Sequence, residues 1–278
     1  MCETADGRSY LVKQSNGKSN GGEAFAYEAI AGMPGLIEGV RSIAAHDVSV
    51  IPFLPDAATL RDTVLNGLQD FFAPIHSMAA SLAVLDVRRD LVDRVPKRAV
   101  PFCFPEPDCS QVLDCNAPLE ELFRTIQEGG IVSQEAVDLV DDLPLAPTHG
   151  DIKLDNVLLR GGDVFLIDWE LFSSGPAGWS IASCVGMVFF AATIASKEET
   201  PSFSQMFAAA QQLFHEYAKL LDRHGLPAPS THSFATMVQL YMLEQVASGL
   251  MFKRQLDPLD RAVIEVVKHI GQSKLHMG

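Results

Sequence analysis

The chain has 278 residues, of which 47% are hydrophobic, so it is long enough to bury one large core or two smaller ones. Its formal net charge of −14 argues against a nucleic-acid partner, because phosphate backbones are bound by basic surfaces. Five cysteines, an odd number, with no secretory signal before them argue against a disulfide framework and favour a reducing cytoplasm.

The first part of the chain predicts a small sheet with one helix. Alternation along the first strand puts Leu11 and Lys13 on the same face. Residues 15–22 contain Gly-Lys-Ser, but Val12 stands where a Walker A phosphate loop requires glycine, so that motif is excluded. The predicted elements are a strand over residues 9–14, a helix over 23–32 and strands over 40–45 and 48–54.

Beyond residue 55 the pattern is mainly helical. Thr59 is a predicted N-cap, and Pro74 predicts a kink or break in a helix over residues 67–86. A proline-rich, irregular insertion covers residues 95–118. The apolar stretch over residues 181–196 is too short to span a membrane and predicts a buried helix. Further helices are predicted over residues 119–128, 202–224, 232–254 and 257–271.

Three of the cysteines, Cys103, Cys109 and Cys115, lie in the irregular insertion and recur every six residues. That interval is not the usual spacing of zinc ligands. Free thiols without a special role are therefore favoured over a metal site.

Residues 145–172 hold the chemistry of the chain. Two apolar runs, residues 157–159 and 164–167, flank a Gly-Gly turn signal and predict a β-hairpin. If Arg160 faces Asp163 across the turn, Asn156 lies opposite residue 167 and therefore next to Asp168. Directly opposed side chains are about 5 Å apart. The Asn156 amide and the Asp168 carboxylate are therefore expected to meet at the open end of the hairpin.

Asn156 and Asp168 therefore predict a metal site. Amide and carboxylate oxygens suit Mg²⁺, which usually takes only one or two carboxylates and fills its shell with water and substrate phosphates. Asp151, five residues earlier, is left for another role, because a carboxylate beside a phosphate-bearing metal can orient a hydroxyl and accept its proton. Strand alternation points Asp155 away from this site.

The run His-Gly-Asp-Ile-Lys-Leu-Asp-Asn over residues 149–156, followed by Ile-Asp-Trp-Glu over 167–170, resembles the aminoglycoside phosphotransferase and choline kinase-like family of the protein-kinase-like superfamily. The resemblance implies an α+β, two-lobed protein-kinase-like fold with a reduced N-terminal β lobe and a mainly helical C-terminal lobe. Residues 1–54 would form the nucleotide-binding lobe, and residues 55–278 the catalytic and acceptor-binding lobe.

The resemblance also implies residues that bind ATP. Lys13 would grip the α and β phosphates, and Glu23 and Glu28 are candidates to pair with it. Glu28 is preferred, because its spacing to the following strand fits the family better. The hinge whose main chain would meet the adenine falls at Pro52, Phe53 and Leu54.

In the same family, Asp151 would orient and deprotonate the acceptor hydroxyl, while Asn156 and Asp168 hold Mg²⁺. Lys153 matches the position where serine and threonine protein kinases carry a lysine that neutralises the moving phosphoryl group, although a solvated loop lysine explains it equally well. His149 is expected to act as a scaffold under the metal-binding aspartate rather than to transfer protons.

The sequence departs from the family before Lys13. Only twelve residues precede it, where the family usually has two strands and a phosphate-covering loop. The first strand and the loop are therefore expected to be missing or reduced. Three explanations are open: the chain starts further upstream, a partner protein completes the N-terminal lobe, or ATP is held from fewer sides and binds weakly.

These features predict an ATP- and Mg²⁺-dependent O-phosphotransferase with a hydroxyl-bearing acceptor. Residues 1–55 contain four basic and six acidic residues, a net charge of −2, which leaves −12 for the remainder. An acidic cleft favours a cationic small molecule of the aminoglycoside or amino-alcohol type, although a solvated acidic surface explains the charge equally well.

Two other interpretations stay open. A peptide serine or threonine in a lanthipeptide-type tailoring pathway is a second acceptor, favoured by Lys153 and by the reduced N-terminal lobe. A pseudokinase or scaffold that binds a partner protein or peptide without transfer is the alternative from another class, motivated by the absent phosphate loop. Neither a nucleic acid nor a membrane is an expected partner.

Overall fold

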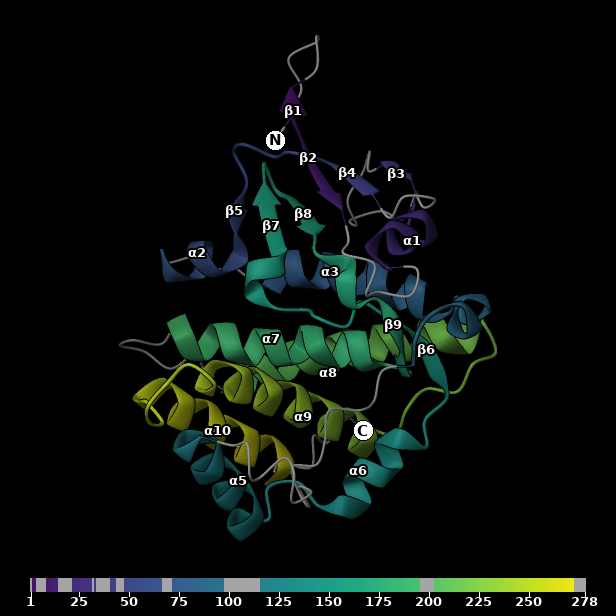
Figure 1. Cartoon of the computed structure of the whole chain (residues 1–278). Coiled ribbons are helices and arrows are strands. Elements are labelled where there is room, and N and C mark those ends of the chain that lie inside the picture. Colours follow the sequence, from purple (N-terminus) through teal and green to yellow (C-terminus); the bar gives the residue numbers. More distant parts are fainter. Residues whose placement is uncertain are drawn as a thin grey trace. The chain divides into compact units, whose positions relative to one another are not determined.

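The computed structural model describes residues 2–3, 9–14, 22–31, 33, 41–43, 48–66, 72–97, 116–195 and 203–272. The chain divides into two compact units (Figure 1). The first comprises Met1–Arg98 and Leu145–Gly175, and the second comprises Ala99–Pro144 and Pro176–Gly278. The three cysteines of the predicted irregular insertion lie outside the described residues.

These units do not coincide with the two predicted lobes. The predicted nucleotide-binding lobe, residues 1–54, lies wholly in the first unit, whereas residues 55–278 are divided between both. The segment that carries the predicted catalytic residues is therefore grouped with the N-terminal sheet. The division of the chain into a nucleotide-binding and an acceptor-binding lobe stays a prediction.

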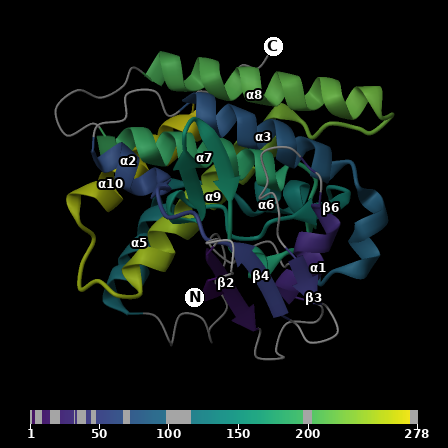
Figure 2. The same cartoon turned by 90° about the horizontal axis from the view of Figure 1, so that it is seen from above.

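The first unit contains a four-stranded antiparallel sheet in the order β1-β2-β4-β3. Strand β2 has the predicted bounds, and in the described part of the chain one two-residue strand, β1, precedes it. Helix α1 packs against β3 and β4, as Figures 1 and 2 show. The elements are β1 (Cys2–Glu3), β2 (Ser9–Gln14), α1 (Gly22–Ala29), β3 (Arg41–Ile43) and β4 (Val48–Pro52).

The rest of the first unit carries the predicted hairpin, which packs through its second strand on helix α3. The predicted cap is present, since the Thr59 hydroxyl accepts from the Asp62 N–H over 3.0 Å. Pro74 lies in the first turn of α3, where its missing N–H needs no partner. The elements are β5 (Ala58–Thr59), α2 (Leu60–Leu65), α3 (Phe72–Asp86), the 3₁₀ helix η2 (Arg89–Arg94), β6 (Leu145–Thr148), η3 (Leu154–Asn156), β7 (Val157–Arg160), β8 (Asp163–Leu166), η4 (Trp169–Leu171) and β9 (Ser173–Pro176).

The described part of the second unit is helical. Helix α9 packs against α5, α6, α7 and α10, and α7 also packs against α8. In α7, 14 of 17 residues are buried, as the apolar stretch predicted. Helix α6 was not predicted, although Ser133 caps it by accepting from the Ala136 N–H. The helices are α5 (Ala117–Gly129), α6 (Gln134–Asp141), α7 (Trp179–Ala195), α8 (Phe203–Arg223), α9 (Thr231–Leu250) and α10 (Pro258–Gln272).

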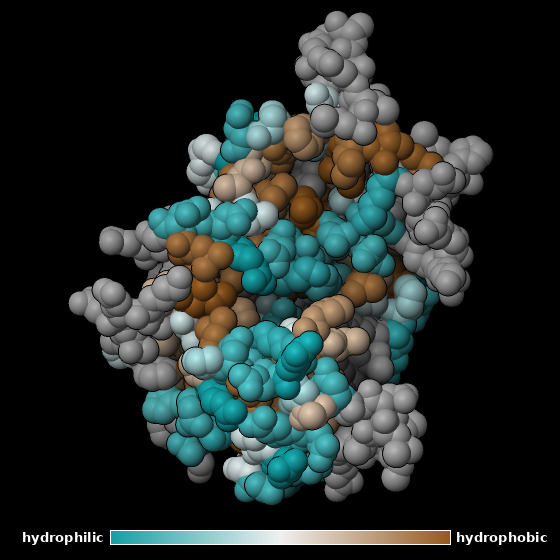
Figure 3. Space-filling model, turned by 60° about the vertical axis from the view of Figure 1, so that its left-hand side comes forward, coloured by the Kyte–Doolittle hydropathy of each residue, from teal (hydrophilic) through white to brown (hydrophobic). Residues whose placement is uncertain are grey.

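The surface drawn in Figure 3 mixes apolar patches with hydrophilic side chains. In the first unit, Leu11, Val12 and Phe53 are among the exposed large apolar residues. Across the described ranges, no helix combines the length and the hydropathy that a membrane span requires.

Candidate active site

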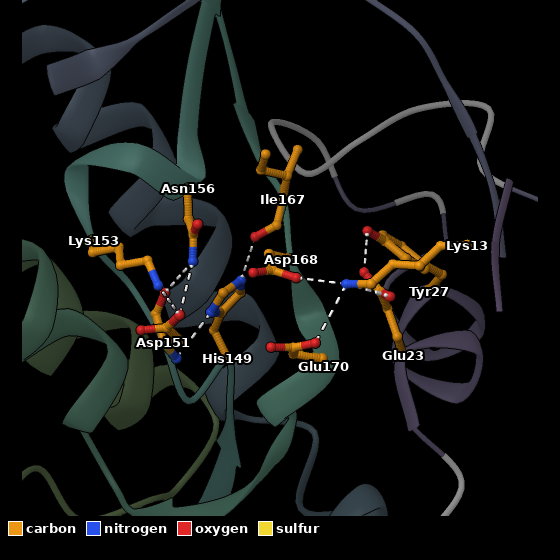
Figure 4. Close-up of polar contacts among 10 residues, drawn as sticks. All are labelled: Lys13, Glu23, Tyr27, His149, Asp151, Lys153, Asn156, Ile167, Asp168 and Glu170. Atoms are coloured by element: carbon orange, nitrogen blue, oxygen red, sulfur yellow. Dashed lines mark hydrogen bonds and ion pairs between the residues drawn. The ribbon is translucent and has the colours of Figure 1, made fainter. Parts of the chain in front are cut away.

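The β7–β8 hairpin has the predicted register. Arg160 pairs with Asp163, and the Ile167 N–H donates to the Asn156 carbonyl over 2.9 Å. Asn156 therefore lies opposite the residue that precedes Asp168. Figure 4 shows both side chains at the open end of the hairpin.

Three of the predicted site residues meet in the loop before the hairpin. The Asn156 side-chain amide donates to the Asp151 carbonyl over 2.8 Å and to Asp151 Oδ2 over 3.1 Å. Lys153 Nζ lies 2.5 Å from the same carboxylate oxygen. The Asp151 carboxylate is thus held by two donors, while about a fifth of its side chain, 21%, stays exposed. A carboxylate fixed in this way can still accept a proton from an incoming hydroxyl.

Lys13 lies among three carboxylates (Figure 4). Its Nζ atom is 2.7 Å from Asp168 Oδ1, 3.0 Å from Glu23 Oε2 and 3.4 Å from Glu170 Oε2. Partial burial lowers the pKa of Lys13, but hydrogen bonds and charges of Asp168 and Glu23 outweigh it, and the net pKa is raised. Lys13 is therefore a cation at neutral pH, as binding to phosphates requires.

The prediction that Glu28 pairs with Lys13 is wrong, because Glu23 forms the ion pair and Glu28 is exposed. The signal that identifies Glu23 is present in the sequence. Residues 23, 26, 27 and 30 follow helical spacing and are all buried, so Glu23 heads the apolar stripe of α1. Glu28 lies outside that stripe.

His149 is fully buried in the first unit. Its Nδ1 accepts the Asp151 N–H over 3.1 Å, so Nε2 carries the proton and donates to the Ile167 carbonyl over 2.9 Å. Its ring meets Trp169 edge-on, with centroids 4.4 Å apart. Burial lowers the pKa of His149 to about 4, which keeps the ring neutral. Both nitrogens are engaged, which supports the predicted scaffold role.

The predicted hinge residues lie at the end of β4, which pairs with β2, the strand that carries Lys13. Pro52 is the last residue of β4, and the Phe53 N–H donates to the Ser9 carbonyl over 2.9 Å. That N–H is therefore already used within the sheet. An adenine edge would have to use neighbouring main-chain groups, such as those of Pro52 and Leu54.

The residues present fit a magnesium ion. The side-chain nitrogen of Asn156 binds Asp151, which leaves the Oδ1 atom of Asn156 for a cation. Of the two carboxylate oxygens of Asp168, Lys13 binds Oδ1. Within the described ranges no group of three or more His, Cys, Asp or Glu could hold a metal. A pair of oxygen ligands suits Mg²⁺, because phosphates and water complete its shell. Asp155 is directed elsewhere, in an ion pair with Arg61 of 2.8 Å.

Comparisons with known proteins identify the family. The profile of the phosphotransferase enzyme family (APH) matches residues 40–220. The chain belongs to this phosphotransferase family. No curated protein matches it significantly. The assignment confirms the predicted resemblance and the predicted enzyme class, a phosphotransferase with an alcohol group as acceptor.

Solved structures of low sequence identity share the fold of this phosphotransferase, which confirms the predicted kinase-like α+β class with its helical C-terminal portion. A glucosamine kinase matches with a TM-score of 0.62 and 13% identity over 97% of this chain and 76% of the other. A choline/ethanolamine kinase family protein from Mesorhizobium loti gives 0.57 and 16% over 97% and 83%. A glucosamine kinase complex with glucosamine, ADP and inorganic phosphate gives 0.57 and 14% over 96% and 77%.

Gly150, which replaces the arginine of protein kinases, is required by the loop of this phosphotransferase. Its φ is +87°, and a Cβ atom there would lie 2.1 Å from the Leu171 carbonyl oxygen. We expect Gly150→Ala to lower the free energy of unfolding by about 3 kcal/mol, measured by urea denaturation. Gly161→Ala is the control, because its φ is +59° but no atom lies within 4 Å. It should cost about 1 kcal/mol. Equal losses would contradict this packing argument.

The low pKa of His149 predicts a pH-dependent stability. Its folded pKa of about 4 lies below the unfolded value of 6.5, so the contribution is complete above 6.5 and is lost as the pH falls towards 4. We expect wild-type unfolding free energy to drop by about 2 to 3 kcal/mol more than that of His149→Gln between about pH 7 and pH 4.5. Parallel losses of unfolding free energy in the wild type and His149→Gln would refute this prediction. His224→Gln is the control, because it removes an exposed histidine instead of the buried one.

Proposed function

We propose that this protein transfers the γ-phosphoryl group of ATP to an acceptor hydroxyl with the help of Mg²⁺. The observation that carries the proposal is the gathering of Asp151, Asn156 and Asp168 around the open end of one hairpin, with Lys13 bound to Asp168. These residues lie on two segments of one compact unit. The combination of base, amide, carboxylate and phosphate-binding cation is what phosphoryl transfer uses.

In the proposed reaction, Asp151 orients the acceptor hydroxyl and takes its proton. The freed oxygen forms a bond to the γ-phosphorus, while the bond from that phosphorus to the β–γ bridging oxygen breaks and ADP leaves. Lys153, beside Asp151, supplies positive charge near the transferring group. Bound Mg²⁺, held by Asn156 and Asp168, would neutralise charge on the phosphates.

Lys13 and Glu23 position the nucleotide in this proposal. Lys13 turns its ammonium from the carboxylates to the α and β phosphates, while Glu23 keeps the side chain aligned. The main chain around residues 52–54 would bind the adenine. ADP in the complex of the similarly folded glucosamine kinase supports a nucleotide as donor.

For the acceptor, we favour a cationic small molecule with a free hydroxyl. The net charge of −12 over residues 56–278 would attract an amine-bearing acceptor. The similar folds include a glucosamine kinase and a choline/ethanolamine kinase family protein, and glucosamine, choline and ethanolamine all carry an amino or ammonium group. A peptide serine or threonine of a lanthipeptide-type pathway, with a partner protein completing the N-terminal lobe, is the second candidate. A cytoplasmic location belongs to the same proposal.

Labelled ATP tests the proposal directly. The protein is incubated with Mg²⁺, [γ-³²P]ATP and a panel of choline, ethanolamine, glucosamine, an aminoglycoside and serine- or threonine-containing peptides. Transfer to an amine-bearing small molecule supports the favoured acceptor, and transfer only to peptides selects the second. If no acceptor is labelled and calorimetry detects no MgATP binding, the enzyme proposal fails and a scaffold role replaces it.

A further inference from the structure

We propose that Tyr27 is a positioning residue, whose buried hydroxyl holds Glu23 in place and thereby sets Lys13 for the nucleotide. This inference rests on the proposed function. Figure 4 shows Tyr27 on α1 beside Glu23, with a dashed line from its hydroxyl to the Glu23 carboxylate. Tyr27 lies outside the runs 149–156 and 167–170 that carry the resemblance to the family.

The two oxygens of Glu23 have different partners. Tyr27 Oη donates to Glu23 Oε1 over 3.1 Å, while Glu23 Oε2 lies 3.0 Å from Lys13 Nζ. Glu23 is 4% exposed and Tyr27 is 3% exposed. A carboxylate this deeply buried is costly unless both oxygens are satisfied. Tyr27 therefore fixes the rotation of the carboxylate and directs its second oxygen at the lysine.

The same hydroxyl also lies near the segment that carries the proposed metal-binding aspartate. The Asp168 backbone acts on the Tyr27 phenol, where it partly offsets the rise in the pKa of Tyr27. Asp168 has a φ of +65°, and no other non-glycine residue among those described has a positive φ. That backbone conformation is uncommon and needs support from its surroundings. The Tyr27 hydroxyl thus binds Glu23 and lies near the residue that binds Lys13 from the other side.

The phenol is suited to this role because it remains a donor. Burial raises the pKa of Tyr27, and the charge of Glu23 raises it further, so the hydroxyl is protonated at neutral pH. The helical spacing fits as well, since residues four apart lie on one face of α1.

A nucleotide-binding assay on four proteins tests this inference. MgADP is titrated by calorimetry, to millimolar concentrations, into the wild type, Tyr27→Phe, Glu23→Gln and the double variant. We expect Tyr27→Phe to weaken binding about tenfold, the typical effect of losing a hydrogen bond to a charged group. Because Tyr27 acts through Glu23, the same substitution should weaken binding less than about threefold in the Glu23→Gln background.

The remaining outcomes are each decisive. A loss of less than about threefold in the wild-type background, or a further loss of threefold or more in the Glu23→Gln background, overturns the inference while leaving the proposed function intact. If the wild type itself binds no MgADP, the proposed function fails. Tyr217→Phe, which removes a hydroxyl from a 2% exposed tyrosine of the second unit, is the matched control and should bind MgADP like the wild type. Urea denaturation checks that each variant is folded.

Discussion

Asp168→Asn is expected to lower the rate of phosphoryl transfer at least about a thousandfold, because the site loses the negative charge that holds the cation and binds Lys13. Asparagine keeps the size of the side chain and tolerates positive φ better than alanine does, so the φ of +65° at this position should persist. The measurement is the transfer rate at saturating ATP with the acceptor that the panel identifies.

The control for Asp168→Asn is Glu170→Gln. Glu170 is also an acidic partner of Lys13, but its side chain is 54% exposed and lies 3.4 Å from the ammonium, compared with 2.7 Å for Asp168. Exposed ion pairs of this kind contribute little, so this variant should lose less than about tenfold. Near wild-type turnover by Asp168→Asn, with the protein folded, would refute the assignment of Asp168 to the metal.

The second large effect is expected for Asp151→Asn. The amide cannot take the acceptor proton, so transfer should fall between about a hundredfold and ten-thousandfold. The substitution keeps an oxygen that can accept from Lys153 and Asn156, so the loop should keep its geometry. Calorimetry should give an unchanged affinity for MgADP, because Asp151 acts on the acceptor and not on the nucleotide.

Asp155→Asn serves as the matched control for Asp151. Asp155 lies four residues later in the same loop, and its carboxylate is paired with Arg61 rather than directed at the site. Its replacement should change the transfer rate less than about threefold, since a half-exposed ion pair is worth little. Similar losses in the two variants would mean that the loop charge as a whole, and not a base at residue 151, supports the reaction.

Much of the site was predictable because its central part is local. A Gly-Gly turn and two apolar runs are enough to set the register of the β7–β8 hairpin, since both act over neighbouring residues. That register brings Asn156 opposite the residue before Asp168, as predicted. The helix N-cap at Thr59 and the buried helix α7 were likewise predictable from adjacent residues. Helix α6 could have been found by the same reasoning from its capping serine.

The partner of Lys13 was predicted incorrectly because spacing along the chain says little about which face of a helix meets a sheet. Glu23 and Glu28 are five residues apart, so they point to different sides of α1. The buried stripe of Ala26, Tyr27 and Ile30 decides between them, and it includes Glu23. The contribution of Tyr27 was missed for the same reason, since its role depends on the orientation of the helix.

The family and the hairpin could be predicted from stretches of neighbouring residues, because motifs and turns are local, and the same stretches contain the residues proposed for phosphoryl transfer. Only the tertiary structure brought Lys13 to Asp168, 155 residues away, and chose Glu23 as the other partner of that lysine. It also grouped the segment that carries the proposed catalytic residues with the N-terminal sheet. Contacts of this kind depend on how the sheet, α1 and the hairpin pack together, and packing is a property of the whole unit rather than of any single stretch.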